Sequence, residues 1–150
     1  MRQLSLSLRP PQLDDLGLAA ALRSHLDRQA SLARLAPHIE IEVGPAQLAA
    51  EAETACFRVA QEAINNIVRH AAAGNVWLRL FVTGERVALS VRDDGRGFDV
   101  AAAQRRAAAG ESLGVVSMEE RVALVGGSLQ IHSAPGQGTV VVASFPVGQG

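Results

Sequence analysis

The stretch SVRDDGRGFDV, residues 90–100, closes a strand-like run and then changes abruptly in character. Ser90–Arg92 continue an alternating apolar pattern, after which DDGRG brings in two acids and two glycines. Acid-glycine pairs are typical of hairpins and loops, so a simple turn is the first interpretation. The alternative is a binding loop, because glycines also stand where backbone must approach a ligand closely. A motif this short does not distinguish a turn from a binding loop, so the surrounding sequence must be used to decide.

Composition narrows the possible functions. The chain has 150 residues, of which 48% are hydrophobic, and its formal net charge is −1. This predicts one globular domain, and the absence of a basic block argues against nucleic acid or an anionic membrane surface as a partner. The single cysteine, Cys56, excludes an internal disulfide and a cysteine-based zinc cluster. Its helical surroundings favour a small core residue over a reactive thiol.

The chain also lacks the usual membrane signals. No apolar run reaches the ~18 residues of a membrane span, and the N-terminal MRQLSLSLRP has no signal-peptide core. We therefore expect a soluble, cytoplasmic piece. A membrane anchor elsewhere in a longer parent protein stays open.

Hydrophobic periodicity predicts a mixture of helices and strands. The order of these helices and strands along the chain predicts an α+β fold, a two-layer sandwich with helices on one face of a mixed sheet. A segment at 99–112 is alanine-rich and suits a loop or a weak helix, and Gly74 is expected to cap the longest helix. The expected helices are 12–30, 45–72 and 114–127, and the expected strands are 38–43, 75–83, 86–92, 128–134 and 139–147, the last four forming two hairpins.

A row of polar residues marks the longest helix, at QEAINNIVRHA. Glu62 and Asn66 are four apart, so they lie about 40° from each other on one face, and His70 continues the row. A solvated helix face is one interpretation. The other follows from the apolar residues around the row, because polar groups on a mostly buried helix need partners. Mg²⁺ would be such a partner, since it prefers oxygen ligands, with Asn66 as the metal ligand and Glu62 free to act as a base.

Further glycines punctuate the second half of the chain, at Gly114 and at Gly136 and Gly138. Gly114 opens a predicted helix, whose free N–H groups would suit a phosphate. Each signal is weak alone, but their order is specific: a polar helix row, two strands, an acid-glycine loop, a glycine-led helix and a glycine-rich hairpin.

In this order the chain resembles the ATP-binding catalytic domain of two-component sensor histidine kinases, in the GHKL ATPase superfamily that includes DNA gyrase. QEAINNIVRHA resembles the N box, DDGRGF the first glycine box, LGVVSMEERVALVGGSL the second and SAPGQGT the last. The likeness covers residues 50–147 and implies the Bergerat-type ATP-binding fold. The preceding LRPPQLDDLGLAAAL resembles the segment that ends the dimerisation domain in the nitrate-sensor-like subgroup.

The resemblance assigns roles around the adenine base. It implies that Asp93 accepts a hydrogen bond from the exocyclic amine of ATP. Gly95 would let the backbone pass under the base, and Gly97 would free the start of a lid. Thr139 would orient Asp93 or a water beside the base. The opening loop is then a binding loop rather than a plain turn.

The resemblance also assigns roles around the phosphates. Asn66 would bind Mg²⁺, Arg69 would reach the phosphates, and Gly114 would hold phosphate oxygens at its helix end. Glu62 stands where hydrolytic members of the superfamily keep their general base. One departure is Ser112, which replaces the first glycine of the usual second box and predicts a stiffer or less closely wrapped lid.

The acceptor histidine of such a kinase is missing from this sequence. His25 lies in a helical pattern but lacks the flanking acceptor motif, and His38 and His132 fall in strands as expected surface residues. We therefore expect residues 1–30 to be the end of a dimerisation-domain helix with its connector, and residues 31–150 to be the ATPase domain. The partners would be a histidine-containing dimerisation domain of the same parent and a downstream response regulator. The fragment itself would be a monomer that binds ATP but does not autophosphorylate.

Two other functions stay open from sequence. One is an anti-sigma-factor-type serine kinase, a stand-alone relative whose acceptor is a protein serine. The other is a nucleotide-sensing module without transfer activity. Phosphotransfer to a supplied partner would discriminate among them.

Overall fold

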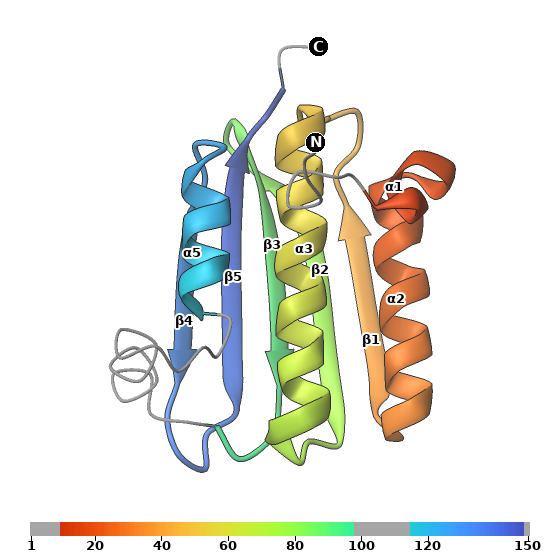
Figure 1. The fold of residues 1–150 in the computed structure, drawn as a ribbon, viewed down its shortest axis with the longest axis vertical. Coiled ribbons are helices and arrows are strands. Elements are labelled where there is room, and N and C mark those ends of the chain that lie inside the picture. Colours follow the sequence, from red (N-terminus) through yellow and green to blue (C-terminus); the bar gives the residue numbers. More distant parts are fainter. Residues whose placement is uncertain (1–9, 98–114, 149–150) are drawn as a thin grey trace, which may run out of the picture.

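The structure, a computed structural model, describes residues 10–97 and 115–148. In these residues helices form one layer and a single five-stranded sheet forms the other, as predicted (Figure 1). The helices are α1 (Pro11–Leu16), α2 (Leu18–Ala33), α3 (Ala50–Asn66), the π-helical turn η2 (Ile67–Ala71) and α5 (Val115–Ala123). The strands are β1 (Ala36–Glu42), β2 (Asn75–Thr83), β3 (Arg86–Asp93), β4 (Ser128–Ser133) and β5 (Thr139–Pro146).

The sheet is mixed. Its strand order is β1-β2-β3-β5-β4, with β1 and β2 parallel and the other neighbours antiparallel. Both predicted hairpins are present, and Gly84 in the GE turn between β2 and β3 has the positive φ, 63°, that such a turn requires. The parallel pair is joined through α3, as expected for a β-α-β crossover.

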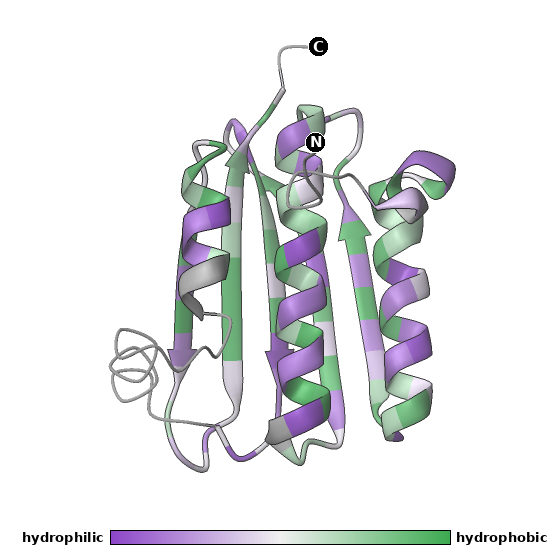
Figure 2. Cartoon of the chain, in the orientation of Figure 1, coloured by the Kyte–Doolittle hydropathy of each residue, from purple (hydrophilic) through white to green (hydrophobic). Residues whose placement is uncertain are grey.

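The hydrophobic core lies between the sheet and the helices. Buried positions alternate along β2, β3 is buried at Val87–Leu89 and again at Val91 and Asp93, and the buried face of α3 carries the apolar stripe predicted for it. Figure 2 shows hydrophilic patches on the face of α2 and α3 that points away from the sheet. Cys56 is fully buried in this core, which confirms the structural role expected for it.

The first helix differs from its prediction. A single helix was expected over 12–30, but Gly17 divides it into α1 and α2 with φ of 82°. Leu13, Leu22 and Leu26 are buried in the same core as α3, so α1 and α2 belong to the same packed unit. The division of the chain near residue 30 into two parts stays a prediction.

The end of the long helix also differs. Gly74 was expected to cap it, but the helix passes into the π-helical turn η2 after Asn66 and stops at Ala72, which adopts the left-handed conformation with φ of 52°. π-Helical turns inside helices are rare and occur frequently at functional sites. The turn rotates the residues after Asn66 away from their α-helical positions, so the regular row expected through His70 is not continued with the same geometry.

None of the helices in the described part of the chain has the length and hydropathy needed to cross a bilayer.

Candidate functional site

The motifs singled out in the sequence gather at one end of the sheet, the lower end in Figure 1. There α3 runs out into η2, β3 ends and β5 begins. Asp93, the last residue of β3, lies opposite Val76 of β2 and Thr139 of β5 in the strand register. Three segments far apart in sequence therefore meet around one carboxylate.

Asp93 is buried, with 3% of its surface exposed, and it lies on the face of the sheet that carries the core. Its Oδ1 accepts a hydrogen bond of 2.7 Å from the backbone N–H of Gly95. Burial raises the pKa of this carboxyl, the neighbouring charge of Asp94 raises it further, and the Gly95 hydrogen bond partly offsets both. A buried carboxylate with a perturbed pKa is a candidate binding group.

The loop after Asp93 packs directly against the β4–β5 turn. Gly97 has φ of 66°, and a Cβ there would overlap the carbonyl oxygen of Ala134. Gly138 has φ of 74°, and a Cβ there would overlap the carbonyl oxygen of Asp93. The N–H of Gly136 donates to the carbonyl of Arg96 across the same contact. In the described residues, glycine at these positions is thus required by backbone packing and by left-handed φ.

Thr139 lies beside Asp93 in the β3–β5 register. The hydrogen bond that the structure gives its hydroxyl is 2.7 Å long and joins it to the Ser133 hydroxyl, which also donates to the carbonyl of Gly138. These bonds hold the first residues of β5 in place. The orientation of Asp93 or of a water by Thr139 stays a prediction.

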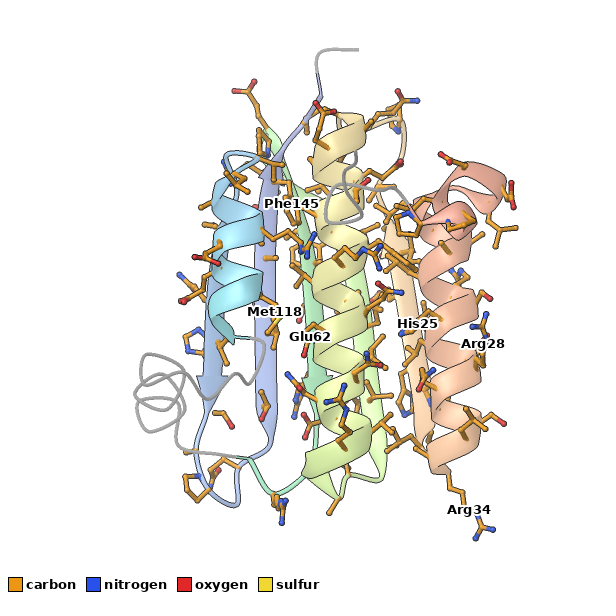
Figure 3. All side chains as sticks on the ribbon, viewed as in Figure 1. His25, Arg28, Arg34, Glu62, Met118 and Phe145 are labelled. Carbon is orange, nitrogen blue, oxygen red and sulfur yellow. The ribbon has the colours of Figure 1, made fainter. Side chains whose placement is uncertain are left out.

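The two polar residues of the α3 row, Glu62 and Asn66, are half-buried, and neither side chain has a hydrogen-bond partner among residues 10–97 and 115–148. Figure 3 places Glu62 on the side of α3 that faces α5, across from Met118. Arg69 in η2 is exposed. The interpretation of the row as a wholly solvated face is therefore not supported, because Glu62 and Asn66 are partly enclosed and their side-chain oxygens bond to none of the described residues.

These oxygens fit a magnesium ion. In the described parts of the chain no three histidine, cysteine or acidic side chains gather into a metal cage. Mg²⁺ rarely uses such a cage, since it keeps several waters and takes one or two protein oxygens beside nucleotide phosphates. A half-buried amide with a carboxylate one turn away suits this mode.

Two of the predicted features lie outside the described residues. Gly114, the expected phosphate-binding helix start, and the segment 99–112 are not described, and α5 is described from Val115. Of His70 only its backbone position in η2 is described.

One residue of the site was missed from sequence. Asp94 accepts three hydrogen bonds, each of 2.9 Å, two from the backbone N–H groups of Gly74 and Asn75 and one from the Asn75 side-chain amide. These bonds lower the pKa of Asp94 to about 2. The sequence showed only an acid in a glycine-rich loop, with no signal for a partner that precedes it by twenty residues.

The remaining histidines divide into buried and exposed. His25, in a helical pattern, is 8% exposed and packs edge-on against the Phe57 ring at a centroid distance of 6.0 Å. His38 and His132 are exposed on their strands, which confirms the surface positions expected for them.

Comparison with known proteins supports the family resemblance. The family model described as histidine kinase-, DNA gyrase B- and HSP90-like ATPase matches residues 51–149. The sensor histidine kinase MctS of Rhizobium johnstonii is 40% identical over 147 residues, covering 97% of this chain and 31% of that protein. The signal transduction histidine-protein kinase/phosphatase DegS of Bacillus subtilis is 34% identical over 142 residues, covering 93% and 36%. The chain thus spans about a third of the length of these curated relatives.

A solved structure shares the fold. The histidine kinase domain of the Erythrobacter litoralis EL346 blue-light activated histidine kinase superposes with a TM-score of 0.70 at 24% sequence identity, covering 87% of this chain and 61% of that one. At this identity the likeness concerns the fold alone, and it agrees with the two-layer architecture.

Proposed function

The chain belongs to the histidine kinase-, DNA gyrase B- and HSP90-like ATPase family, and from this premise we propose that it binds Mg-ATP and donates the γ-phosphoryl group to a histidine on a separate dimerisation domain. That domain would belong to the same longer sensor kinase, with a response regulator as the next acceptor. The nitrate-sensor-like subgroup is part of this proposal. We also propose that the domain lies in the cytoplasm and that this chain is a monomer.

The observation that carries the proposal is the buried carboxylate of Asp93 at the end of β3. Its Oδ1 is held by Gly95, which leaves Oδ2 to accept from a ligand. An acceptor fixed at the edge of an apolar core suits the exocyclic amine of adenine, because the base itself is flat and largely apolar. A hydrogen bond to a charged acceptor adds ~1.5–3 kcal/mol of net stabilisation.

The phosphate end of the nucleotide would lie toward α3. Asn66 would hold the metal through its amide oxygen, Glu62 would orient or deprotonate the attacking group, and exposed Arg69 would approach the phosphates. Mg²⁺, when bound, would neutralise charge on the phosphate oxygens. Positioning and charge neutralisation supply most of the catalysis in phosphoryl transfer, with little covalent chemistry left to the protein.

The test has two stages. In the first, calorimetric titration measures ADP and a non-hydrolysable ATP analogue with and without Mg²⁺, on the wild type and on Asn66→Ala. We expect micromolar to sub-millimolar binding in the wild type and loss of the Mg²⁺ dependence in Asn66→Ala. No heat with any nucleotide at millimolar concentration would overturn the proposal for this chain.

In the second stage, radiolabelled ATP is supplied with a histidine-bearing dimerisation domain. Labelling at that histidine supports the kinase function. If label appears only on a protein serine, the serine-kinase alternative holds, and binding without transfer to either acceptor favours a nucleotide-sensing module.

A further inference from the structure

Asp94 stands between the two halves of the candidate site. It follows Asp93 directly, and its carboxylate reaches back to the segment that leads from η2 into β2. Its Oδ1 accepts from the N–H groups of Gly74 and Asn75, and its Oδ2 accepts from the Asn75 Nδ2. The backbone of Asp94 also donates to the carbonyl of Asn75 at 3.4 Å.

Asn75 extends this contact to the neighbouring strand. Its Oδ1 lies 2.9 Å from the Nε2 of His38 in β1. The carbonyl of Gly74 accepts from the N–H of Ala36, at the start of the same strand. The beginnings of β1 and β2 and the end of β3 are therefore tied together at one point, and Asp94 is its only charged acceptor in the described residues.

The hydrogen bonds between Asp94 and the Gly74–Asn75 segment link the two parts of the candidate site. Gly74 comes soon after the helix that carries Glu62 and Asn66, and Asp94 comes immediately after Asp93. The Asp94 carboxylate therefore connects two segments. One is the segment that follows the proposed metal-binding helix, and the other is the loop that follows the proposed adenine acceptor. The left-handed residue Ala72 and the π-helical turn lie just before Gly74, so the hydrogen bonds also fix the exit of an irregular helix end.

We propose that Asp94 is a positioning residue for nucleotide binding, which sets the adenine acceptor Asp93 relative to the helix that carries Asn66. This inference rests on the proposed function. The depressed pKa of Asp94, about 2, agrees with a carboxylate that stays ionised and fully used by these donors. Charge-assisted hydrogen bonds of this kind are the stronger ones in proteins.

A reciprocal exchange tests the inference. Asp94→Asn keeps one oxygen for the two backbone N–H groups but places an amide donor against the Asn75 amide donor. Asn75→Asp places a carboxylate against Asp94. The double variant Asp94→Asn with Asn75→Asp restores a donor and an acceptor in reversed order, keeps the net charge and leaves an oxygen for His38.

The readouts are ADP affinity without Mg²⁺ by calorimetry, and hydrogen-exchange protection of the Gly74 and Asn75 amides. Each single variant should weaken ADP binding about tenfold, the loss expected for one charged hydrogen bond, and should lower the protection of both amides. The double variant should recover affinity to within about threefold of the wild type. Asp27→Ala, which removes an exposed carboxylate from α2, is the matched control and should change neither readout.

Unchanged ADP affinity in both single variants would overturn the inference while leaving the proposed function intact. A double variant as weak as the singles would also overturn it, since a specific pairing should be rescued. If the wild type binds no nucleotide, the proposed function fails instead. The exchange of the Gly74 and Asn75 amides then still decides whether Asp94 holds this segment.

Discussion

Replacing Asp93 by asparagine should separate nucleotide binding from stability. The carboxylate has two acceptor oxygens, and Oδ1 is occupied by the Gly95 N–H at 2.7 Å. The amide of Asp93→Asn has a single acceptor oxygen. If that oxygen keeps the Gly95 bond, the amide N–H₂ faces the adenine amine, and two donors meet. If the amide turns, the Gly95 N–H loses its partner.

The size of the effect follows from the bond that is lost. A hydrogen bond to a charged acceptor contributes ~1.5–3 kcal/mol, which corresponds to about 10- to 150-fold in the dissociation constant. The loss should be the same for ADP with and without Mg²⁺, because in the proposed binding mode Asp93 contacts the adenine and not the metal.

The same substitution should have the opposite effect on the free domain. The pKa of Asp93 is raised above its ordinary value of 3.8, mainly by burial and then by the charge of Asp94. Between the unfolded and the folded pKa, the folded state binds more protons, so stability falls as pH rises through that window and stays lower above it. Asp93→Asn removes this cost, and its melting temperature without nucleotide at neutral pH should equal or exceed that of the wild type.

Calorimetric titration tests the predicted loss of ADP affinity, and thermal melts on the same preparations test the predicted effect on stability. The expected result is weaker ADP binding together with an unchanged or higher melting temperature in the absence of ligand. Asp93→Asn that binds ADP within about twofold of the wild type would refute the adenine role, since the loss of a charged acceptor cannot be that small. Weak binding with a much lower melting temperature would mean that the carboxylate is structural.

Three further outcomes are expected. Gly138→Ala should destabilise the domain by about 1–3 kcal/mol more than Gly136→Ala in denaturant unfolding, because both have positive φ but only at Gly138 does a Cβ meet backbone, the carbonyl of Asp93; equal losses would contradict the packing argument. Burial and then the charge of Arg28 lower the pKa of His25, so the domain should be fully stable above the unfolded pKa of 6.5 and should lose stability as pH drops below it. His25→Leu should reduce the change in melting temperature across a series of pH values. An unaltered pH dependence in this variant would show that other groups dominate. Phe57→Ala should cost about 3–5 kcal/mol in the same unfolding assay because the ring is fully buried, and a loss under about 1 kcal/mol would mean that the core closes around the gap.

Much of the fold could be predicted because its elements carry strong local patterns. The long apolar stripe of α3 and the alternation in β2 and β3 each specify one buried face, and the GE turn fixes a hairpin. The strand order could not be read in this way. The placement of β5 between β3 and β4, and the parallel pairing of β1 with β2, depend on contacts between segments far apart in the chain.

The misses have local physical causes. The sequence predicts one helix over 12–30, but the positive φ of Gly17 divides α1 from α2, and both pieces still bury leucines in one core. The sequence predicts Gly74 as the helix cap because glycine usually takes the left-handed position, whereas Ala72 takes it in the structure. The N–H of Gly74 instead donates a hydrogen bond to the Asp94 carboxylate, a contact that no local sequence pattern predicts.

These departures concentrate at one end of the sheet. The left-handed Ala72, the π-helical turn, the closely packed Gly97 and Gly138, and the buried carboxylate of Asp93 all lie where β3 ends and β5 begins. The left-handed φ of Ala72 and the burial of the Asp93 carboxylate each cost the folded domain some stability, and such costs persist only where the surrounding structure over-determines them. The core of α3, β2 and β3 supplies that support, and the hydrogen bonds of Asp94 join the loop to the start of β2. A carboxylate buried at this position is less favourable than a neutral side chain unless it is paired, so Asp93 is the strongest argument that this end of the sheet is arranged to hold a ligand.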